Sequence, residues 1–203
     1  GEVGALYADR RVEKNDEGYI PYTPGQTIAT ENTTPFKIGT VNPKWNLGWR
    51  HGFNYKGINA SVMFTARIGG NVISKTQATL DRFGVSKTSA DARETGYVML
   101  GNIKMEPQDY YGTIYDLDSY YVYSATNIRL QEASIGYTLP NKWFGNVVKN
   151  VNVSVYGTNL WMIYNKAPYD PELTASTGTF GQGYDYFMLP SSRTYGFSLK
   201  FGF

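Results

Sequence analysis

The sequence predicts an all-β protein whose long antiparallel strands belong to a transmembrane β-barrel. Three observations carry this prediction. Apolar and polar residues alternate over several long segments, tyrosine and glycine are frequent (18 and 22 of 203 residues), and long connections take turns with short ones along the chain. Period-two alternation is typical of strands. Tight turns at one end and elaborate loops at the other are typical of outer-membrane barrels.

Two segments in the first third of the chain predict a hairpin. Residues 45–55 (WNLGWRHGFNY) and 58–68 (INASVMFTARI) alternate throughout and are joined by the dipeptide Lys56-Gly57. Five apolar side chains of this hairpin are predicted to face lipid: Trp45, Trp49, Phe53, Val62 and Phe64. Small and polar residues of the opposite parity are predicted to point inward: Gly48, Arg50, Ser61, Thr65, Ser154 and Ser198.

Four further strands are predicted, near 1–9, 127–139, 151–163 and 193–203. In the second of these the alternation changes phase near Glu132, which predicts a β-bulge. Six strands do not close a membrane barrel, because the smallest ones have about eight. The chain is therefore expected to be the C-terminal part of a larger barrel or to assemble with other chains.

Composition excludes several other classes of protein. A net charge of +2 gives no sign of a nucleic-acid partner, and no run reaches the ~20 apolar residues of a membrane helix. One histidine, no cysteine and no GxSxG or HExxH motif predict that the chain is not an enzyme and holds no cofactor. Two acidic pairs, Asp116 with Asp118 and Asp170 with Glu172, are interpreted as solvated loop acids rather than calcium ligands, so no metal site is predicted.

Aromatic side chains gather in the long connections. They are predicted to contact a ligand or a lid protein: Tyr110, Tyr111, Tyr115, Tyr120, Tyr121, Tyr184, Tyr186 and Phe187. Aromatic rings with a polar tip suit sugars and peptide side chains. Packing between loops or against a lipoprotein lid, where aromatic residues are also enriched, is slightly favoured over ligand contact for the same residues.

Several phrases of the sequence resemble one family when taken in order. The segments GTVNPKWNLGWRHGFNY, ASIGYTLPNKW, VSVYGTNLW, YDPE and the final RTYGFSLKFGF are similar to the C-terminal part of SusC/RagA-family TonB-dependent outer-membrane transporters. The resemblance implies a barrel of about 22 strands in the outer membrane of a Gram-negative, Bacteroidetes-type bacterium. The plug domain and the TonB box of that family are expected to be absent from these 203 residues.

The resemblance also implies a function and partners. Such transporters import large nutrients, glycans or oligopeptides, together with a SusD/RagB-like surface lipoprotein, and are energised by TonB through the missing N-terminal part. The terminal aromatics Tyr195, Phe197, Phe201 and Phe203 resemble the signal read by the barrel-assembly machinery. The alternative hypothesis is a soluble β-sandwich that acts as a carbohydrate-binding module.

Overall fold

A computed structural model describes residues 2–143, 149–173 and 181–202 of the chain. These residues divide into two compact units. The sheet unit comprises Pro43–Gly69, Ala125–Asp170 and Leu189–Phe203, and the loop unit comprises Gly1–Asn42, Gly70–Ser124 and Pro171–Met188. None of the helices in the described segments is long and apolar enough to cross a membrane.

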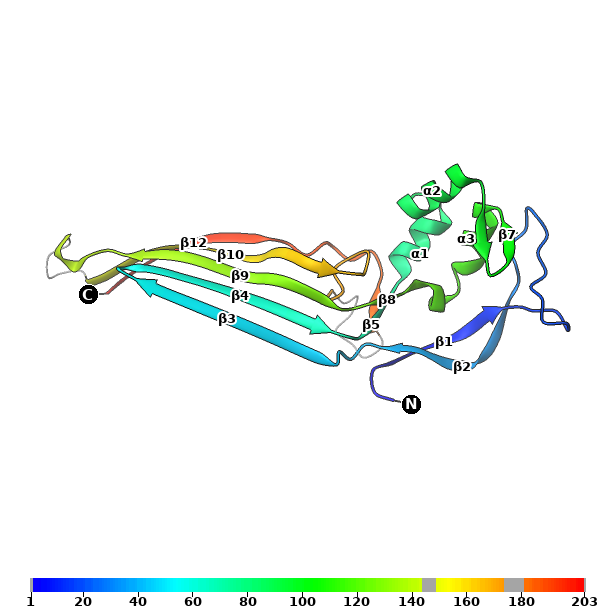
Figure 1. Ribbon diagram of the computed structural model, residues 1–203, viewed down its shortest axis with the longest axis horizontal. Helices are drawn as coiled ribbons and strands as arrows, with labels where there is room; N and C mark the ends of the chain where they lie inside the picture. Colours follow the sequence, from blue (N-terminus) through cyan, green and yellow to red (C-terminus); the bar gives the residue numbers. More distant parts are fainter. Residues whose placement is uncertain (1, 144–148, 174–180, 203) are drawn as a thin grey trace. The chain divides into compact units, whose positions relative to one another are not determined.

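The sheet unit is one antiparallel sheet of five long strands, drawn side by side in Figure 1. Across the sheet the strands are β12 (Thr194–Gly202), β10 (Lys149–Asn165), β9 (Asn127–Thr138), β4 (Ile58–Ile68) and β3 (Trp45–Tyr55). The short helix η2 (Asn141–Trp143) follows β9. The observed bounds of β3 and β4 coincide with the predicted ones, and those of the other three differ from them by at most two residues at either end. The all-β fold class is confirmed, although the described strands do not close a barrel.

A tight turn sets the register of β3 against β4. Lys56 and Gly57 both have positive φ angles, 48° and 88°, as a two-residue type I′ hairpin requires. A Cβ on Gly57 would lie 2.8 Å from the carbonyl oxygen of Thr138. Only glycine fits this position, and Tyr55 pairs directly with Ile58.

A bulge in β9 keeps its apolar residues on one face. Met63 of β4 pairs with Glu132, whereas the next residue, Phe64, pairs with Leu130, so that Gln131 is the extra residue. The bulge lies next to the predicted position. Without it, the apolar residues before and after Gln131 would point to opposite faces of the sheet, and with it they share one face.

The loop unit is built from shorter elements. Its strands are β1 (Ala5–Val12), β2 (Thr30–Thr40), β5 (Asn71–Ser74), β6 (Val98–Leu100), β7 (Ile103–Met105), β8 (Val122–Ser124) and β11 (Tyr184–Asp185). Its helices are α1 (Lys75–Arg82), α2 (Lys87–Thr95), α3 (Pro107–Ile114) and η1 (Asp118–Tyr121). They form a β1–β2 ladder, a three-stranded β11–β5–β8 sheet and a β6–β7 hairpin.

Some expectations for this region were wrong. The strand expected near 1–9 covers Ala5–Val12 and, within the described residues, pairs with β2 instead of extending the main sheet. Strand β2 was not predicted, because TENTTPFKIGT contains few apolar residues and a proline. The connection between 68 and 127 was expected to be a long loop, and it contains the three α-helices found within the described residues.

A small apolar core holds the loop unit together. Ala78 of α1 packs with Tyr111 and Ile114 of α3, and with Leu117 and Tyr121 around η1. Burial of these side chains is the main source of stability available to a unit of this size.

Candidate functional site

The sheet has one continuous apolar face. Pairing places Trp49, Phe64, Leu130 and Trp161 in one row across four strands. A second row contains Phe53, Ala60, Ile135, Val155 and Phe197.

The five side chains predicted to face lipid all lie on this apolar face. Trp45, Trp49 and Phe53 are exposed, with 64%, 59% and 54% of their surface accessible, and Val62 and Phe64 are half-buried among their neighbours. His51, on the same face, stacks on Trp49 with ring centroids 5.7 Å apart. A contiguous exposed apolar patch is typical of a surface that contacts a membrane, another protein or a ligand.

The opposite face of the sheet is polar and its side chains bond across the strands. The hydroxyls of Ser61 and Ser134 are 2.8 Å apart. Arg50 donates to Glu132 at 2.7 Å. The Thr138 hydroxyl accepts from Asn59 and Asn152, both at 3.0 Å. This face therefore satisfies polar groups within the sheet, as the wall of an aqueous lumen does.

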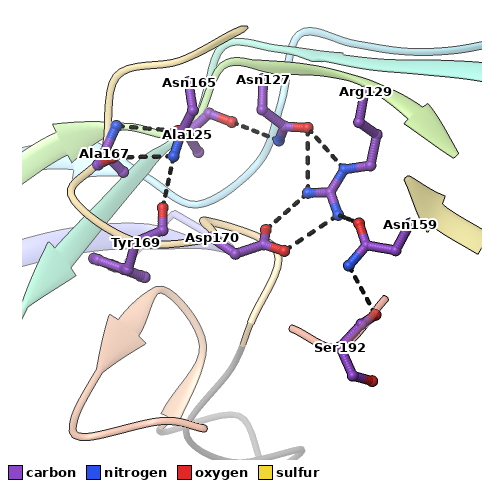
Figure 2. Close-up of polar contacts among 9 residues, drawn as sticks. All are labelled: Ala125, Asn127, Arg129, Asn159, Asn165, Ala167, Tyr169, Asp170 and Ser192. Atoms are coloured by element: carbon purple, nitrogen blue, oxygen red, sulfur yellow. Dashed lines mark hydrogen bonds and ion pairs between the residues drawn. The ribbon is translucent and has the colours of Figure 1, made fainter. Parts of the chain in front are cut away.

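A buried ion pair lies at one end of the polar face (Figure 2). Arg129 of β9 donates to Asp170 through two nitrogens, Nη2 to Oδ1 at 2.7 Å and Nη1 to Oδ2 at 3.2 Å. Only 5% and 8% of the two side chains are exposed. Arg129 also donates to the side-chain oxygens of Asn127 and Asn159. A bidentate arginine–carboxylate contact fixes both partners in orientation.

Two asparagines of β10 form hydrogen bonds with the connection between β10 and β12. Asn165 donates to the carbonyl oxygens of Ala167 and Tyr169, at 3.0 and 2.7 Å, and accepts from the amide of Ala167. Asn159, whose φ angle is +52°, donates to the carbonyl oxygen of Ser192 at 3.1 Å. The connection from β10 to β12 is thus held at both of its ends, as Figure 2 shows. We call the ion pair and its three asparagines the loop anchor: Arg129, Asp170, Asn127, Asn159 and Asn165.

The loop anchor corrects the interpretation of Asp170 as a solvated acid, because this carboxylate is buried and paired. Asp118 likewise pairs with Lys75, and Asp116 lies 3.7 Å from Arg10. No cluster of three metal-binding side chains occurs within the described segments. Sequence reasoning missed the roles of Asn127, Asn159 and Asn165, and the only available signal was their position at strand ends and next to bulges.

The aromatic residues predicted to contact a ligand fall into two groups. Tyr111 and Tyr121 are 6% and 2% exposed and belong to the core of the loop unit, and Tyr110 and Tyr115 pack against that core. Burial, with a smaller contribution from the Asp81 carboxylate, raises the pKa of Tyr111 to about 12. For these tyrosines the structure shows packing between loops, the second use that the sequence left open.

The other group is exposed, apart from the half-buried Tyr184. Tyr120, Tyr186 and Phe187 have 43%, 62% and 52% of their surface accessible. Tyr186 and Phe187 form an edge-to-face pair with centroids 5.2 Å apart.

Hydrogen bonds hold the chain just before this aromatic pair and at Phe187. The buried Asp185 accepts from the Ser74 hydroxyl at 2.8 Å, and the amide of Phe187 donates to Thr76 Oγ1 at 2.6 Å. Phe187 has a φ angle of +48°, which is rare for a bulky residue and costs conformational energy. The aromatic pair is therefore held in place by its surroundings.

The terminal strand β12 carries three of the four predicted assembly residues. Tyr195, Phe197 and Phe201 share one parity and are 70%, 76% and 53% exposed. Phe203 lies outside the described residues. Whether these side chains are read during barrel assembly stays a prediction.

Comparisons with known proteins agree with this architecture. No family model matches the chain. The chain is 26% identical over 172 residues to TonB-dependent receptor P3 of Formosa agariphila, and the match covers 81% of the chain and 17% of that receptor. The chain therefore spans about a sixth of the length of this relative.

Solved structures of the RagAB peptide importer have the same fold. The open-open state matches 98% of the chain and 22% of its own chain, with a TM-score of 0.65 and 20% identity. The closed-closed state matches 94% of the chain and 22% of its own, with a TM-score of 0.58 and 16% identity. The resemblance predicted from the ordered motifs is thus confirmed: the chain is similar to one part of the SusC/RagA-like TonB-dependent transporters.

Proposed function

We propose that this chain is the barrel-wall segment of an outer-membrane TonB-dependent importer of large nutrients. One observation carries the proposal: the five strands align their apolar residues into rows on one face and their polar residues on the other. The apolar face meets outer-membrane lipid, and the polar face lines the lumen. The names of the matched proteins, a receptor and an importer, support transport rather than catalysis.

We further propose that the imported nutrient is a glycan or an oligopeptide. The exposed pair Tyr186 and Phe187, with Tyr120, offers flat apolar faces and a hydroxyl that suit sugar rings or peptide side chains. A SusD/RagB-like lipoprotein is the proposed partner on the loop side, and TonB is engaged through the rest of the longer protein. The matched RagAB complex is a peptide importer, which supports the oligopeptide as the first substrate to test.

The loop anchor gives this transport role a structural basis. It connects the loop that carries Asp170 to the polar face of β9 through a buried ion pair. Loops that are held at their bases keep a binding chamber open and defined without needing a ligand to order them.

The test compares the uptake of candidate nutrients by cells with and without the full-length protein. Fluorescent oligopeptides and glycans of matched size are offered to wild-type cells, to a deletion strain and to the strain complemented with the full-length gene. We expect the deletion to lose uptake of one ligand class and the complemented strain to regain it, with uptake abolished by a protonophore. Unchanged uptake of both classes, or a full-length protein found outside the outer membrane, would contradict the proposal.

A further inference from the structure

A cavity of about 580 Å³ lies within the loop unit, between helices α1, α2 and α3. Its floor includes three buried residues, Asp81, Ser89 and Tyr111. Its rim includes the more accessible Arg82, Arg93 and Glu106. Pockets of this size with a few convergent polar groups are typical of small-ligand sites.

Asp81 is the unusual member of this pocket. Asp81 is only 5% exposed, and its carboxylate forms no ion pair among the described residues. One carboxylate oxygen, Oδ1, accepts from Gln77 Nε2 at 2.7 Å and from the Ser86 hydroxyl. The structure gives the other oxygen, Oδ2, no hydrogen bond within the described segments. Buried charges in proteins are normally paired.

Neither rim arginine supplies the missing positive charge. Arg82 lies over the ring of Tyr115, 4.3 Å from its centroid. Arg93 donates to the carbonyl oxygen of Gly84 at 2.5 Å. Each guanidinium group thus has a partner other than Asp81, and each keeps further N–H donors.

Helix ends of both polarities line the pocket, because the N-terminal end of α3, at Glu106, Pro107 and Gln108, lies there together with the C-terminal ends of α1 and α2. Asp81 lies in the last turn of α1, and Gly96, the C-cap of α2, also lines the pocket. The C-terminus of a helix carries a partial negative charge, which disfavours a carboxylate and favours a cation. Tyr111, which also lines the pocket, makes no side-chain hydrogen bond within the described segments.

We propose that this pocket binds a protonated primary amine, with the ammonium group on Asp81 Oδ2. A metal ion fits poorly, because no three metal-binding side chains gather in the described residues and calcium takes about six to eight oxygen ligands. A guanidinium group also fits poorly, because its planar fork prefers both carboxylate oxygens and Oδ1 is already occupied. An ammonium is a compact charge that needs one open oxygen.

The ammonium group has two sources in a peptide, its amino terminus and a lysine side chain. The rim residues suit either source, because Arg82 and Arg93 retain donors for the carbonyl or carboxylate oxygens that accompany the amine, and Phe83 offers an apolar surface. The site belongs to the loop unit alone and does not depend on the proposed import function.

The test is calorimetric binding to the full-length protein in detergent. Three probes are compared: alanyl-alanine amide with a free amino terminus, acetyl-lysine amide with only a side-chain ammonium, and acetyl-alanine amide with neither. Two variants are compared with wild type: Asp81→Asn, which removes the charge, and Asp91→Asn, a control on the exposed side of α2 where Asp91 pairs with Lys87.

We expect at least one amine probe to bind wild type in preference to acetyl-alanine amide, and the preferred probe identifies the source of the ammonium. Asp81→Asn is expected to weaken that binding about tenfold or more, and Asp91→Asn to leave it unchanged. If Asp81→Asn does not fold, hydrogen exchange on wild type decides, because the amine probe is expected to protect amides within 81–96. Equal binding of all three probes, equal affinity of the two variants, or no protection of 81–96 would overturn the proposal.

Discussion

Arg129 and Asp170 form a bidentate ion pair in which both side chains are more than nine-tenths buried. The pair joins strand β9 to the chain that follows β10. Its partner Asn159 also holds the far end of that loop, at Ser192. A single arginine therefore organises both ends of a long loop.

The first prediction concerns the substitution Asp170→Asn. It leaves the buried Arg129 guanidinium without a counter-charge, so we expect the free energy of unfolding to fall by about 3–5 kcal/mol. The urea midpoint of the full-length protein, followed by the mobility of its folded form on unboiled gels, measures the effect. We also expect faster proteolysis between residues 171 and 192.

The matched control for this prediction is Glu132→Gln. It breaks the pair with Arg50, in which the arginine and glutamate side chains are 59% and 34% exposed, and is expected to cost about 1 kcal/mol or less. Equal midpoints for the two variants would show that the buried pair has no special role.

The second prediction compares adjacent residues of β4 on opposite faces. Phe64→Arg places a charge on the apolar face and is expected to cost about 2–4 kcal/mol near the bilayer midplane. Thr65→Arg places the same charge on the polar face and is expected to spare assembly. The amount of folded full-length protein in isolated outer membranes measures both, and normal levels of the Phe64→Arg variant would be incompatible with a lipid-facing surface.

The third prediction concerns the β3–β4 turn. Gly57→Ala introduces a Cβ at a φ angle of +88°, 2.8 Å from the Thr138 carbonyl oxygen, and is expected to destabilise the hairpin by about 1–3 kcal/mol. Gly52→Ala is the control, since a Cβ there meets no atom within 4 Å. A urea midpoint of the Gly57→Ala variant that matches the control would show that the turn tolerates a side chain.

The fourth prediction is a pH dependence in the loop unit. Burial raises the pKa of Tyr111 from about 10 to about 12. In the unfolded chain this phenol loses its proton near pH 10, whereas in the folded protein it keeps the proton until about pH 12. The contribution of the buried, protonated phenol to the free energy of unfolding is therefore fully present below pH 10 and is lost as the pH rises from 10 to 12.

The variant Tyr111→Phe isolates this effect. Its urea midpoint is expected to fall less steeply than that of wild type between pH 10 and 12. Parallel curves for the two proteins would mean that the phenol titrates alike in the folded and unfolded states.

The strands of the sheet were predictable because their information is local. In β3 and β4 every second residue repeats the same character, so parity assigns both the strand and its faces. The same reasoning located the bulge beside Glu132 from a change of phase. It also located β1 approximately but could not give its partner, because alternation identifies a strand and says nothing about which strand pairs with it.

The helices of the loop unit carried signals that period-two reasoning did not use. Ser74 and Ser86 cap α1 and α2 through their hydroxyl groups, and Pro107 begins α3. These are recognised start signals of helices. Such signals identify the elements, although not the pocket that they enclose.

The loop anchor was not predictable, because its parts come together only through the sheet register. Asp170 is an ordinary loop acid in the sequence, and its partner Arg129 lies on another strand. Their burial depends on how β9 and β10 pair. Long-range partners of this kind can be identified only from a three-dimensional structure.

The two faces of the sheet are assigned to lipid and to water, and spin labels test this central claim most directly. A nitroxide is attached at Ala60→Cys or at Ser61→Cys, neighbours on β4 with opposite parity, in the full-length protein in phospholipid vesicles. We predict that the label at position 60 is relaxed by oxygen, which concentrates in lipid, and the label at 61 by a water-soluble nickel chelate. Equal accessibility to the nickel chelate at both positions would contradict the account.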